Sequence, residues 1–539
     1  MSTHPPDQLA APPLRGGPSD AVHRRRWAIL GVLAISVFLV VVDNTIVNVA
    51  LPTLSRELDA GTSQLQWIVD AYSLVFAGLL LAFGSLGDRF GRKGALQIGL
   101  LLFAATSLLA AFAGSAEGLI LARAAMGVGA ALVFPATLAI LTNVFVDPTE
   151  RAKAIGVWSA ISGLAVALGP LTGGWLLEHF WWGSVFLVNL PIVAVALGLG
   201  AVLVPRSKDP HAGRLDPVGL LSSIAAIALL VYTVIEAPHR GWTSVETIGS
   251  FAASLGLFAA FISWERRRRD PMLDVGVFRN PRFSAASFSV AAAFFGLFGF
   301  IFLITQYFQF VRGHSTLSAG VHTLPFAIAA GVTAPIAARL ALRFGTTRVV
   351  AAGLTSMSLG FLWASTLTTE TAYWGPMVGQ MVLMASGMTL TTAPATEAIL
   401  GALPKEKAGV GSAVNDTTRE LGGTLGVAVV GSVFSSLYGP RLVERLAGLP
   451  IPAEGLEVAR SSVQGAAAVA ELAPPVGRPI ILDAARDAFM EGLAGGVRVA
   501  ALATAIGAVL AWRFLPARGV DLNAESEPTP VPTGAGIGG

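Results

Sequence analysis

Long apolar runs recur along the whole 539-residue chain and leave one kind of structure open to it. A helix crosses a bilayer with about 20 predominantly apolar residues. Windows of that length lie near 27–50, 63–86, 95–113, 118–143, 153–177, 183–204, 215–236, 246–264, 284–310, 318–341, 348–367, 373–400, 408–436 and 494–514. Hydrophobic residues make up 54% of the chain and charged residues 13%, about half the charged share of a soluble domain. We therefore predict an all-α integral membrane protein with fourteen transmembrane helices.

The basic residues indicate how these helices cross the membrane. Most of the 36 lysine and arginine residues lie in the N-terminal tail and in the loops that would share its side. Lysine and arginine gather in short loops on the cytoplasmic side of membrane proteins. We therefore expect a multi-pass protein of the cytoplasmic membrane with both termini in the cytoplasm.

Composition also restricts the chemistry. The chain has no cysteine, which excludes disulfides, thiolate catalysis and cysteine-ligated metals. Its sequence contains no Walker A motif, Cys/His metal spacing or nucleophile elbow. The net charge is only +3 and the basic residues stay in loops, so binding to nucleic acid is not expected. We expect no enzyme activity, no cofactor and no metal site, and a lipid bilayer as partner; the sequence does not indicate the oligomeric state.

A charged turn between the second and third windows matches a known pattern. Residues 84–96 read GSLGDRFGRKGAL and fit G-x-L-x-D-R-x-G-R-K-x-x-L at every fixed position. This turn resembles the signature loop between the second and third membrane helices of the major facilitator superfamily, with a generic basic loop as the alternative. A weaker copy near residues 339–348, which lacks the aspartate, indicates an internal repeat. By the resemblance we expect conformational gating roles for Gly84, Asp88, Arg89, Gly91 and Arg92.

A second family motif lies in the fifth window. Residues 169–174 read GPLTGG and resemble the core G-P-x-x-G-G of the family's antiporter motif. Pro170 removes a backbone hydrogen bond and kinks the helix, while the glycines allow close packing against a helix across the domain interface. The chain departs from the family at Ala165, a usual glycine, and in the segment before 189–191, which lacks the usual arginine. We expect gating roles for Gly169, Pro170, Gly173 and Gly174, with ordinary membrane-helix packing as the alternative.

The order of the windows is also informative. Six windows, an extra pair over 215–264 and six more resemble the fourteen-helix drug:proton antiporters of the major facilitator superfamily. This resemblance implies two six-helix bundles plus two additional central transmembrane helices. The expected regions are a disordered tail (1–26), the N-terminal bundle (27–204), a linker with the extra helices (205–283), the C-terminal bundle (284–518) and a disordered tail (519–539). Within the last bundle, a long outer loop (437–493) could form a short helical hairpin from 456–472 and 480–492.

Charged side chains at membrane depth are costly, so each one suggests a function. Asp43, in VVDNTIVNVALP, resembles the acidic position of the first-helix motif of these exporters, and Arg123, in LARAAMGVG, resembles their fourth-helix arginine. The resemblance implies proton coupling for both residues, because a guanidinium stabilises an ionised carboxylate and a shift of that contact releases or captures a proton. The alternatives are a capping role for Asp43 near the outer helix end and snorkelling of Arg123 to the outer interface.

The thirteenth window carries three charges within the segment NDTTRE. Asp416 and Glu420 share one helical face, and Arg419 lies one turn from Asp416. Two carboxylates this close in a low dielectric do not both ionise freely. We expect Asp416 to bind substrate or protons and Glu420 to bind substrate. A purely structural Asp416–Arg419 pair is the alternative.

Three further polar residues are candidates for substrate binding. Asp70 lies early in the second helix, where it could bind a cationic substrate or act as a structural carboxylate stabilised by the helix dipole. Gln306 and Gln309 are polar positions within an aromatic ninth helix, which makes them candidates for a cavity.

These features together predict a transporter. We expect proton-coupled efflux, by antiport, of amphipathic and cationic drugs or antibiotics, with two bundles rocking about a central site. The partners are then protons, a small-molecule drug and the lipid bilayer. A proton-linked importer or facilitator of a small metabolite, and a membrane sensor that does not transport, are the alternatives.

Overall fold

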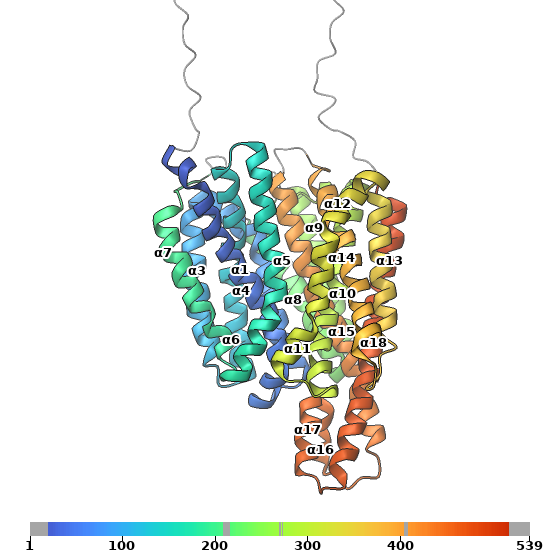
Figure 1. The fold of residues 1–539 in the computed structure, drawn as a ribbon. Coiled ribbons are helices and arrows are strands. Elements are labelled where there is room, and N and C mark those ends of the chain that lie inside the picture. The colour runs from blue at the N-terminus through green and yellow to red at the C-terminus, as the bar shows by residue number, and fades with distance from the viewer. Residues whose placement is uncertain (1–19, 209–215, 269–270, 272, 404–407, 517–539) are drawn as a thin grey trace, which may run out of the picture.

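The computed structural model describes residues 20–208, 216–268, 271, 273–403 and 408–516, and its regular elements within these ranges are all helices. The long helices run side by side between two ends of the molecule (Figure 1). The described chain ends, Asp20 and Pro516, lie at the same end, which we call the termini end; the opposite end is the distal end. This arrangement follows from the apolar windows, since only helices or closed barrels satisfy backbone groups in lipid.

The N-terminal bundle contains the first six predicted spans, and α6 and α7 together form the sixth. Its helices are α1 (Asp20–Glu57), α2 (Thr62–Phe90), α3 (Arg92–Ala111), α4 (Ala116–Val144), α5 (Pro148–His179), α6 (Ser184–Leu187) and α7 (Asn189–Leu203). The two parts of α2, Thr62–Leu80 and Ala82–Phe90, are bent by 53°.

Helix α1 begins before the first apolar window, so residues 20–26 are helical rather than part of a disordered tail. Arg26 explains this difference, because it makes two hydrogen bonds of 2.9 and 2.8 Å to the carboxylate of Glu150. The Arg26 guanidinium also holds the pKa of Glu150 below its ordinary value. The remainder of the predicted N-terminal tail, 1–19, and the predicted tail at 519–539 lie outside the described residues.

The extra pair, α8 (Pro217–Arg240) and α9 (Val245–Arg267), forms a helical hairpin between the bundles in the sequence. The two helices pack on each other, and α8 also contacts α2 and α15 (Ala408–Arg445). It therefore packs on one helix of each bundle. A short 3₁₀ helix, η1 (Val275–Arg279), leads into the second bundle.

The C-terminal bundle supplies the remaining spans. Helix α10 (Pro281–Gln306) continues as a π-helical turn, η2 (Tyr307–Val311), and α14 follows a kinked turn, η3 (Tyr373–Met377), in which Trp374 and Gly375 are not helical. The other helices are α11 (Thr316–His322), α12 (Leu324–Phe344), α13 (Thr346–Ala364), α14 (Val378–Leu400), α15 and α18 (Gly477–Phe514).

A helix covers each of the fourteen apolar windows, but fewer meet a strict test for a membrane span. Within the described residues, 11 helices are long and apolar enough to cross a membrane, or up to 12 if the bent α2 is one span. Helices α13 and α14 are not among them. These two pack on each other and α13 packs on α18, and helix–helix interfaces in membranes are enriched in small and polar residues, which lower the mean hydropathy. The predicted total of fourteen spans is therefore not confirmed.

The region predicted as a long outer loop is helical. Helices α15 and α18 extend past the membrane windows at the distal end, and α16 (Ala453–Ser461) and α17 (Val463–Leu472) pack between them (Figure 1). The first predicted hairpin arm corresponds to α16 and α17, whereas 480–492 is the start of α18 rather than a separate helix. Buried Leu442 on α15 and Phe489 on α18 explain the long helices, and Arg445 on α15 adds exposed ion pairs with Asp487 at 3.0 Å and Glu491 at 2.8 Å on α18.

Candidate functional site

A fully buried polar cluster lies at the centre of the N-terminal bundle. Asp43 on α1 accepts a hydrogen bond of 2.5 Å from Nη1 of Arg123 on α4 and one of 2.7 Å from Nδ2 of Asn189 on α7. The relative exposure of all three residues is 0%. Separating Arg123 from Asp43 would leave an uncompensated buried charge. The cluster therefore links the positions of three helices to one carboxylate.

Arg123 is held in place by more than the carboxylate. Its Nε donates to the carbonyl oxygen of Ile68 at 3.1 Å, and its guanidinium lies 4.3 Å from the ring centre of Tyr72 on α2. Its Nη2 has no hydrogen-bond partner among the described residues. Because the side chain is completely buried, it does not snorkel to an interface. Asp43 lies inside α1, which continues to Glu57, so its carboxylate does not cap a helix end.

Asn189 belongs to this cluster although the sequence reasoning gave it no role. It is the first residue of α7, and its Nδ2 also donates to Oγ of Ser107 at 3.1 Å. The signal in the sequence was the segment Asn189-Leu190-Pro191, whose proline lies in the first turn of α7, where a helix tolerates it. The motif therefore places an amide beside the carboxylate of a helix 146 residues away in the chain.

A second charged cluster lies on α15 and is more open. Arg419 approaches Asp416 at 3.8 Å, and their side chains are 37% and 13% exposed. The Arg419 guanidinium lies 4.7 Å from the ring centre of Phe294 on α10. Asn415 donates to Asp416 at 3.4 Å, and Glu420 is half-buried with no salt bridge within the described residues. This face combines carboxylates and an aromatic ring, the groups that attract an amphipathic cation.

The two bundles contact each other in their distal halves. Gln66 on α2 donates to the carbonyl oxygen of Ala428 on α15 at 2.9 Å. Thr305 on α10 donates to the Asn48 carbonyl at 3.0 Å, and Gln309 on η2 donates to that of Val49 at 2.9 Å. Within the described ranges, the hydrogen bonds between the bundles all lie in this half. The distal end is therefore closed in this conformation.

Three predicted substrate residues lie within or beside this closed region. Asp70 on α2 is completely buried, and neither carboxylate oxygen has a hydrogen-bond partner among the described residues. Gln306 is also buried and donates to the carbonyl of Phe302 in its own helix at 2.9 Å. Gln309 bridges to the other bundle through Val49. In this conformation these side chains hold the closed interface or fill it.

The glycines of the 169–174 motif contact both bundles. A Cβ atom at Gly173 would lie 2.6 Å from Ile46 on α1, and one at Gly169 would overlap Thr45. A Cβ atom at Gly174 would lie 2.6 Å from Cα of Leu317 on α11, in the other bundle. These glycines thus permit backbone-close packing, and Gly174 does so across the distal interface.

The charged turn at 84–96 joins α2 and α3 at the termini end. Gly91 has a φ of 124°, a conformation that favours glycine, and its amide donates to the Gly87 carbonyl at 2.9 Å. Asp88 pairs with Arg92 at 2.6 Å, and Arg92 also donates to the carbonyl of Ala139 on α4 at 3.3 Å. The Arg89 guanidinium lies 5.5 Å from its neighbouring Phe90 ring. The turn therefore ties α2, α3 and α4 together.

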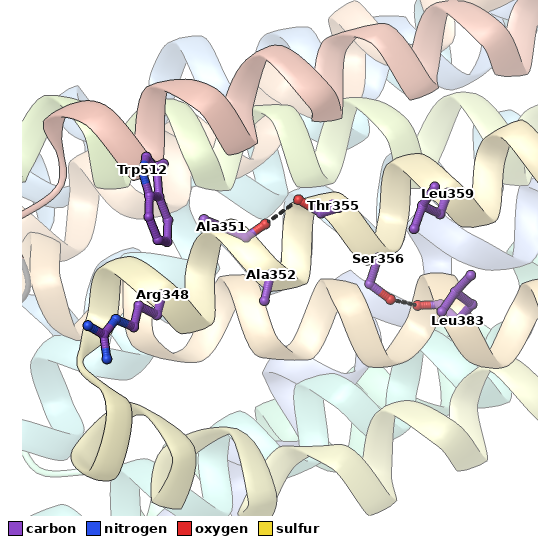
Figure 2. A pocket seen from close by; sticks show the side chains of 8 residues that line it. All are labelled: Arg348, Ala351, Ala352, Thr355, Ser356, Leu359, Leu383 and Trp512. Carbon is purple, nitrogen blue, oxygen red and sulfur yellow. Dashed lines mark hydrogen bonds between the residues drawn. The ribbon is translucent and has the colours of Figure 1, made fainter.

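A groove of about 400 Å³ opens elsewhere, between α13, α14 and α18 (Figure 2). Its two central hydroxyl groups already bond to helix carbonyls, Thr355 to Ala351 and Ser356 to Leu383, both at 2.8 Å. Its remaining lining is mostly apolar, with Trp512 at one end. We do not assign it to the site, because it shares no residue with either charged cluster. Among the described residues, no group of three His, Cys, Asp or Glu side chains could hold a metal ion.

Comparison with known proteins finds relatives that cover nearly the whole chain. The multidrug efflux pump LfrA of Mycolicibacterium smegmatis is 39% identical over 490 residues, which cover 91% of this chain and 96% of that protein. The methyl viologen resistance protein SmvA of Salmonella typhimurium is 39% identical over 475 residues, or 86% and 93% of the two chains. The tetracenomycin C resistance and export protein of Streptomyces glaucescens is 30% identical over 527 residues, 96% of each chain.

Solved structures agree on the fold. A bacterial homologue of the human lysosomal transporter Spinster, in an inward-facing and unoccupied conformation, superposes with a TM-score of 0.65 at 18% identity, over 93% of this chain and 98% of that one. Residues 33–427 match the family model described as Major Facilitator Superfamily. The chain therefore belongs to the major facilitator superfamily.

Proposed function

We propose that this protein exports amphipathic, cationic drugs from the cytoplasm in exchange for protons, by alternating access. The observation that carries the proposal is the buried contact of Asp43 with Arg123 and Asn189, which joins three helices through one titratable group. Support for the drug as cargo comes from relatives named for multidrug efflux and antibiotic resistance. The family and these names indicate a transporter rather than an enzyme.

Protonation of Asp43 changes what the cluster can hold together. The ionised carboxylate accepts from both Arg123 and Asn189, so the present packing suits the charged form. A proton on Asp43 removes the attraction to Arg123, which stays charged at every physiological pH. The guanidinium then favours a new arrangement of α1, α4 and α7. We propose that this switch couples proton binding to movement of the bundle.

The drug would meet the other cluster first. Asp416 and Glu420 are partly exposed on α15, and Phe294 lies beside them through its contact with Arg419. Asp70, Gln306 and Gln309 would become available only after the distal interface separates, because they are buried or bridging now. We therefore propose Asp416 and Glu420 as the substrate-facing carboxylates of this conformation.

Orientation follows from the same proposal. With both termini in the cytoplasm, the distal end faces outward and this distal-closed conformation is the one that accepts drug from inside. The charged turn at 84–96 and the 169–174 motif would then act at opposite ends of the alternating movement. One proton that crosses about 100 mV releases roughly 2.3 kcal/mol, enough for more than tenfold accumulation of a neutral drug at about 1.4 kcal/mol per decade. Exchange of one proton for one monovalent cation moves no net charge and draws only on the pH gradient.

The proposal is tested in everted membrane vesicles that are energised by a proton gradient, acidic inside. Wild type should accumulate a cationic dye inside the vesicles, and a protonophore should abolish the accumulation. Asp43→Asn should lose it, while Glu454→Gln, which changes an exposed carboxylate on α16, should keep it. Proton-driven accumulation by Asp43→Asn at the wild-type level would contradict the proposal. Wild-type movement of dye in the opposite direction would favour an importer, and no movement at all would favour a sensor.

A further inference from the structure

We propose that Asp70 is a second proton-binding site, one that must take up a proton from the distal side before the two bundles can close there. Asp70 would thus set the pH at which the distal end reseals. This role differs from that of Asp43, because the proton on Asp70 returns to the side from which it came. The inference rests on the alternating access of the proposed function and not on the coupling role of Asp43.

Asp70 lies on the face of α2 that packs across the distal interface. Gln66, one turn before it, donates to the carbonyl oxygens of Val427 and Ala428 on α15 at 3.2 and 2.9 Å. Leu74, one turn after it, belongs to an apolar cluster with Ala428 and with residues of α8. Residues four apart share a helical face, so Asp70 lies between two residues that contact α15.

Nothing in the closed interface compensates a charge on Asp70. The residue is completely buried, and neither carboxylate oxygen has a hydrogen-bond partner within the described residues. On the facing helix, Thr424 lies one turn from Ala428, and its hydroxyl oxygen is also buried without a partner. An ionised carboxylate is strongly disfavoured at such a place, whereas the protonated acid is tolerated. The closed interface therefore selects the protonated form.

The surrounding ionisable groups do not change this conclusion. Asp43 and Arg123 are engaged with each other, and Glu236 faces Arg240 at 4.0 Å in its own helix. No hydrogen bond or ion pair joins Asp70 to any of these residues or to the other groups described on the neighbouring helices. The ionisable residues along the adjoining stretches are Asp43 on α1, Arg123 on α4, Tyr232 and Glu236 on α8, and Glu420 on α15, and the part of α3 beside Asp70 carries none.

Opening of the distal end would expose Asp70 to water, where a carboxylate ionises at neutral pH. Closing then requires one proton, so the ratio of closed to open molecules should fall about tenfold for each unit of rising pH while the open form is ionised. In an export cycle this makes resealing after drug release dependent on protons outside. A neutral residue at position 70 should close equally well at every pH.

The chain has no cysteine, so label pairs can be introduced directly into the full-length protein. We would place spin labels at Gly114→Cys, in the distal loop before α4, and Glu370→Cys, in the distal loop after α13, and measure their separation in nanodiscs at pH 5.5 and 7.5. When Asp70 is present, the distribution of distances between the two labels should shift toward long distances at pH 7.5. Asp70→Asn should keep the short distance at both pH values. Asp70→Asn with the wild-type pH response, or a wild-type distance that ignores pH, would overturn the inference.

Two further variants separate this inference from other causes. Asp70→Leu, which is also uncharged, should reproduce the behaviour of Asp70→Asn, and a pH response restored by leucine would contradict the proposal. The same comparison in an Asp43→Asn background should again show loss of the response only when Asp70 is replaced. If Asp43→Asn still couples drug transport to protons but Asp70→Asn has lost the distal pH response, the proposed role of Asp43 is wrong and the proposed role of Asp70 is supported. If Asp70→Asn loses only binding of a cationic dye and keeps the pH response, Asp70 is a substrate residue instead.

Discussion

The two charged clusters of this protein use similar side chains in opposite environments. In the N-terminal bundle, Asp43 and Arg123 are completely buried and 2.5 Å apart. In the C-terminal bundle, Asp416 and Arg419 are 13% and 37% exposed and 3.8 Å apart. A dry, close pair forces the helices that carry it to move together, because separation strands a charge. A wetter, longer pair costs little to separate, so its groups remain available to a ligand.

The neighbours of each pair explain the difference. Asp43 is reached by residues of α4 and α7, so its contacts are long-range and exist only in the folded bundle. Asp416 and Arg419 lie on the same helix at an i, i+3 spacing, and Asn415 adds a third local contact. The first cluster can therefore transmit a change between helices, whereas the second acts mainly on what approaches α15.

The largest expected effect comes from removing one member of the buried pair. Asp43→Leu leaves Arg123 charged and unpaired, and such a loss destabilises a protein by about 3–5 kcal/mol. The double variant Asp43→Leu/Arg123→Leu should recover most of this stability, because no charge remains buried. Thermal unfolding in detergent measures both effects. If the single and double variants unfold at the same temperature, the pair is not coupled as we describe; neither variant should transport.

The next largest effect is expected from a substitution at the distal contact of the 169–174 motif. A Cβ atom at Gly174 would lie 2.6 Å from Leu317 of the other bundle, and overpacking of this kind costs about 1–3 kcal/mol. Gly174→Ala should therefore favour the distal-open conformation and slow export. Gly163→Ala is the matched control on the same helix, since a Cβ atom there meets nothing within 4 Å. Equal export and equal distal label distances in the two variants would contradict a gating role for Gly174.

A smaller effect on stability is expected at the partly exposed pair of Asp416 and Arg419. Asp416→Asn should change the free energy of unfolding by only about 0.2–1 kcal/mol, because the pair is partly solvated. Its effect on substrates should be larger, with roughly tenfold weaker binding of a dication such as methyl viologen, about 1.4 kcal/mol. Binding titrations compare this dication with a neutral antibiotic, and Glu420→Gln serves as the neighbouring variant. Loss of every compound, rather than of dications alone, would assign Asp416 to coupling instead of substrate binding.

The smallest effect is a pH dependence at the distal end. Burial, followed by the charges of His322 and Arg312, lowers the pKa of His314, whose ring lies 4.2 Å from that of His322. A histidine with a lowered pKa favours folding in its neutral form, so the stabilisation is present at high pH and is lost as pH falls below about 6.5. Wild type should thus lose slightly more thermal stability between pH 7.5 and 5.5 than His314→Asn. An equal or opposite pH response in the variant would contradict this sign.

The sequence predicted the helices better than the contacts between them. Apolar windows and charged positions mark α1 and Asp43 locally, and the family motifs suggested that Asp43 and Arg123 act together. Asn189 was not predicted as their partner, because a contact over 146 residues leaves no local periodicity. Gln66 and Gln309 are likewise ordinary polar residues until folding places carbonyls of the other bundle beside them. The start of α1 and the length of α18 were missed because the contacts that support them, the Arg26–Glu150 pair and the packing of α18 on the end of α15, join residues far apart in the sequence.

The most direct test of the central claim measures proton movement caused by drug. Purified protein is reconstituted into vesicles that contain a pH-sensitive dye, and a cationic drug is added to one side. We predict that wild type moves protons against the drug, while Asp43→Asn still binds the drug but moves none. Drug-driven proton movement of wild-type size in Asp43→Asn would contradict the account, because the buried Asp43–Arg123 contact would then not be the coupling element.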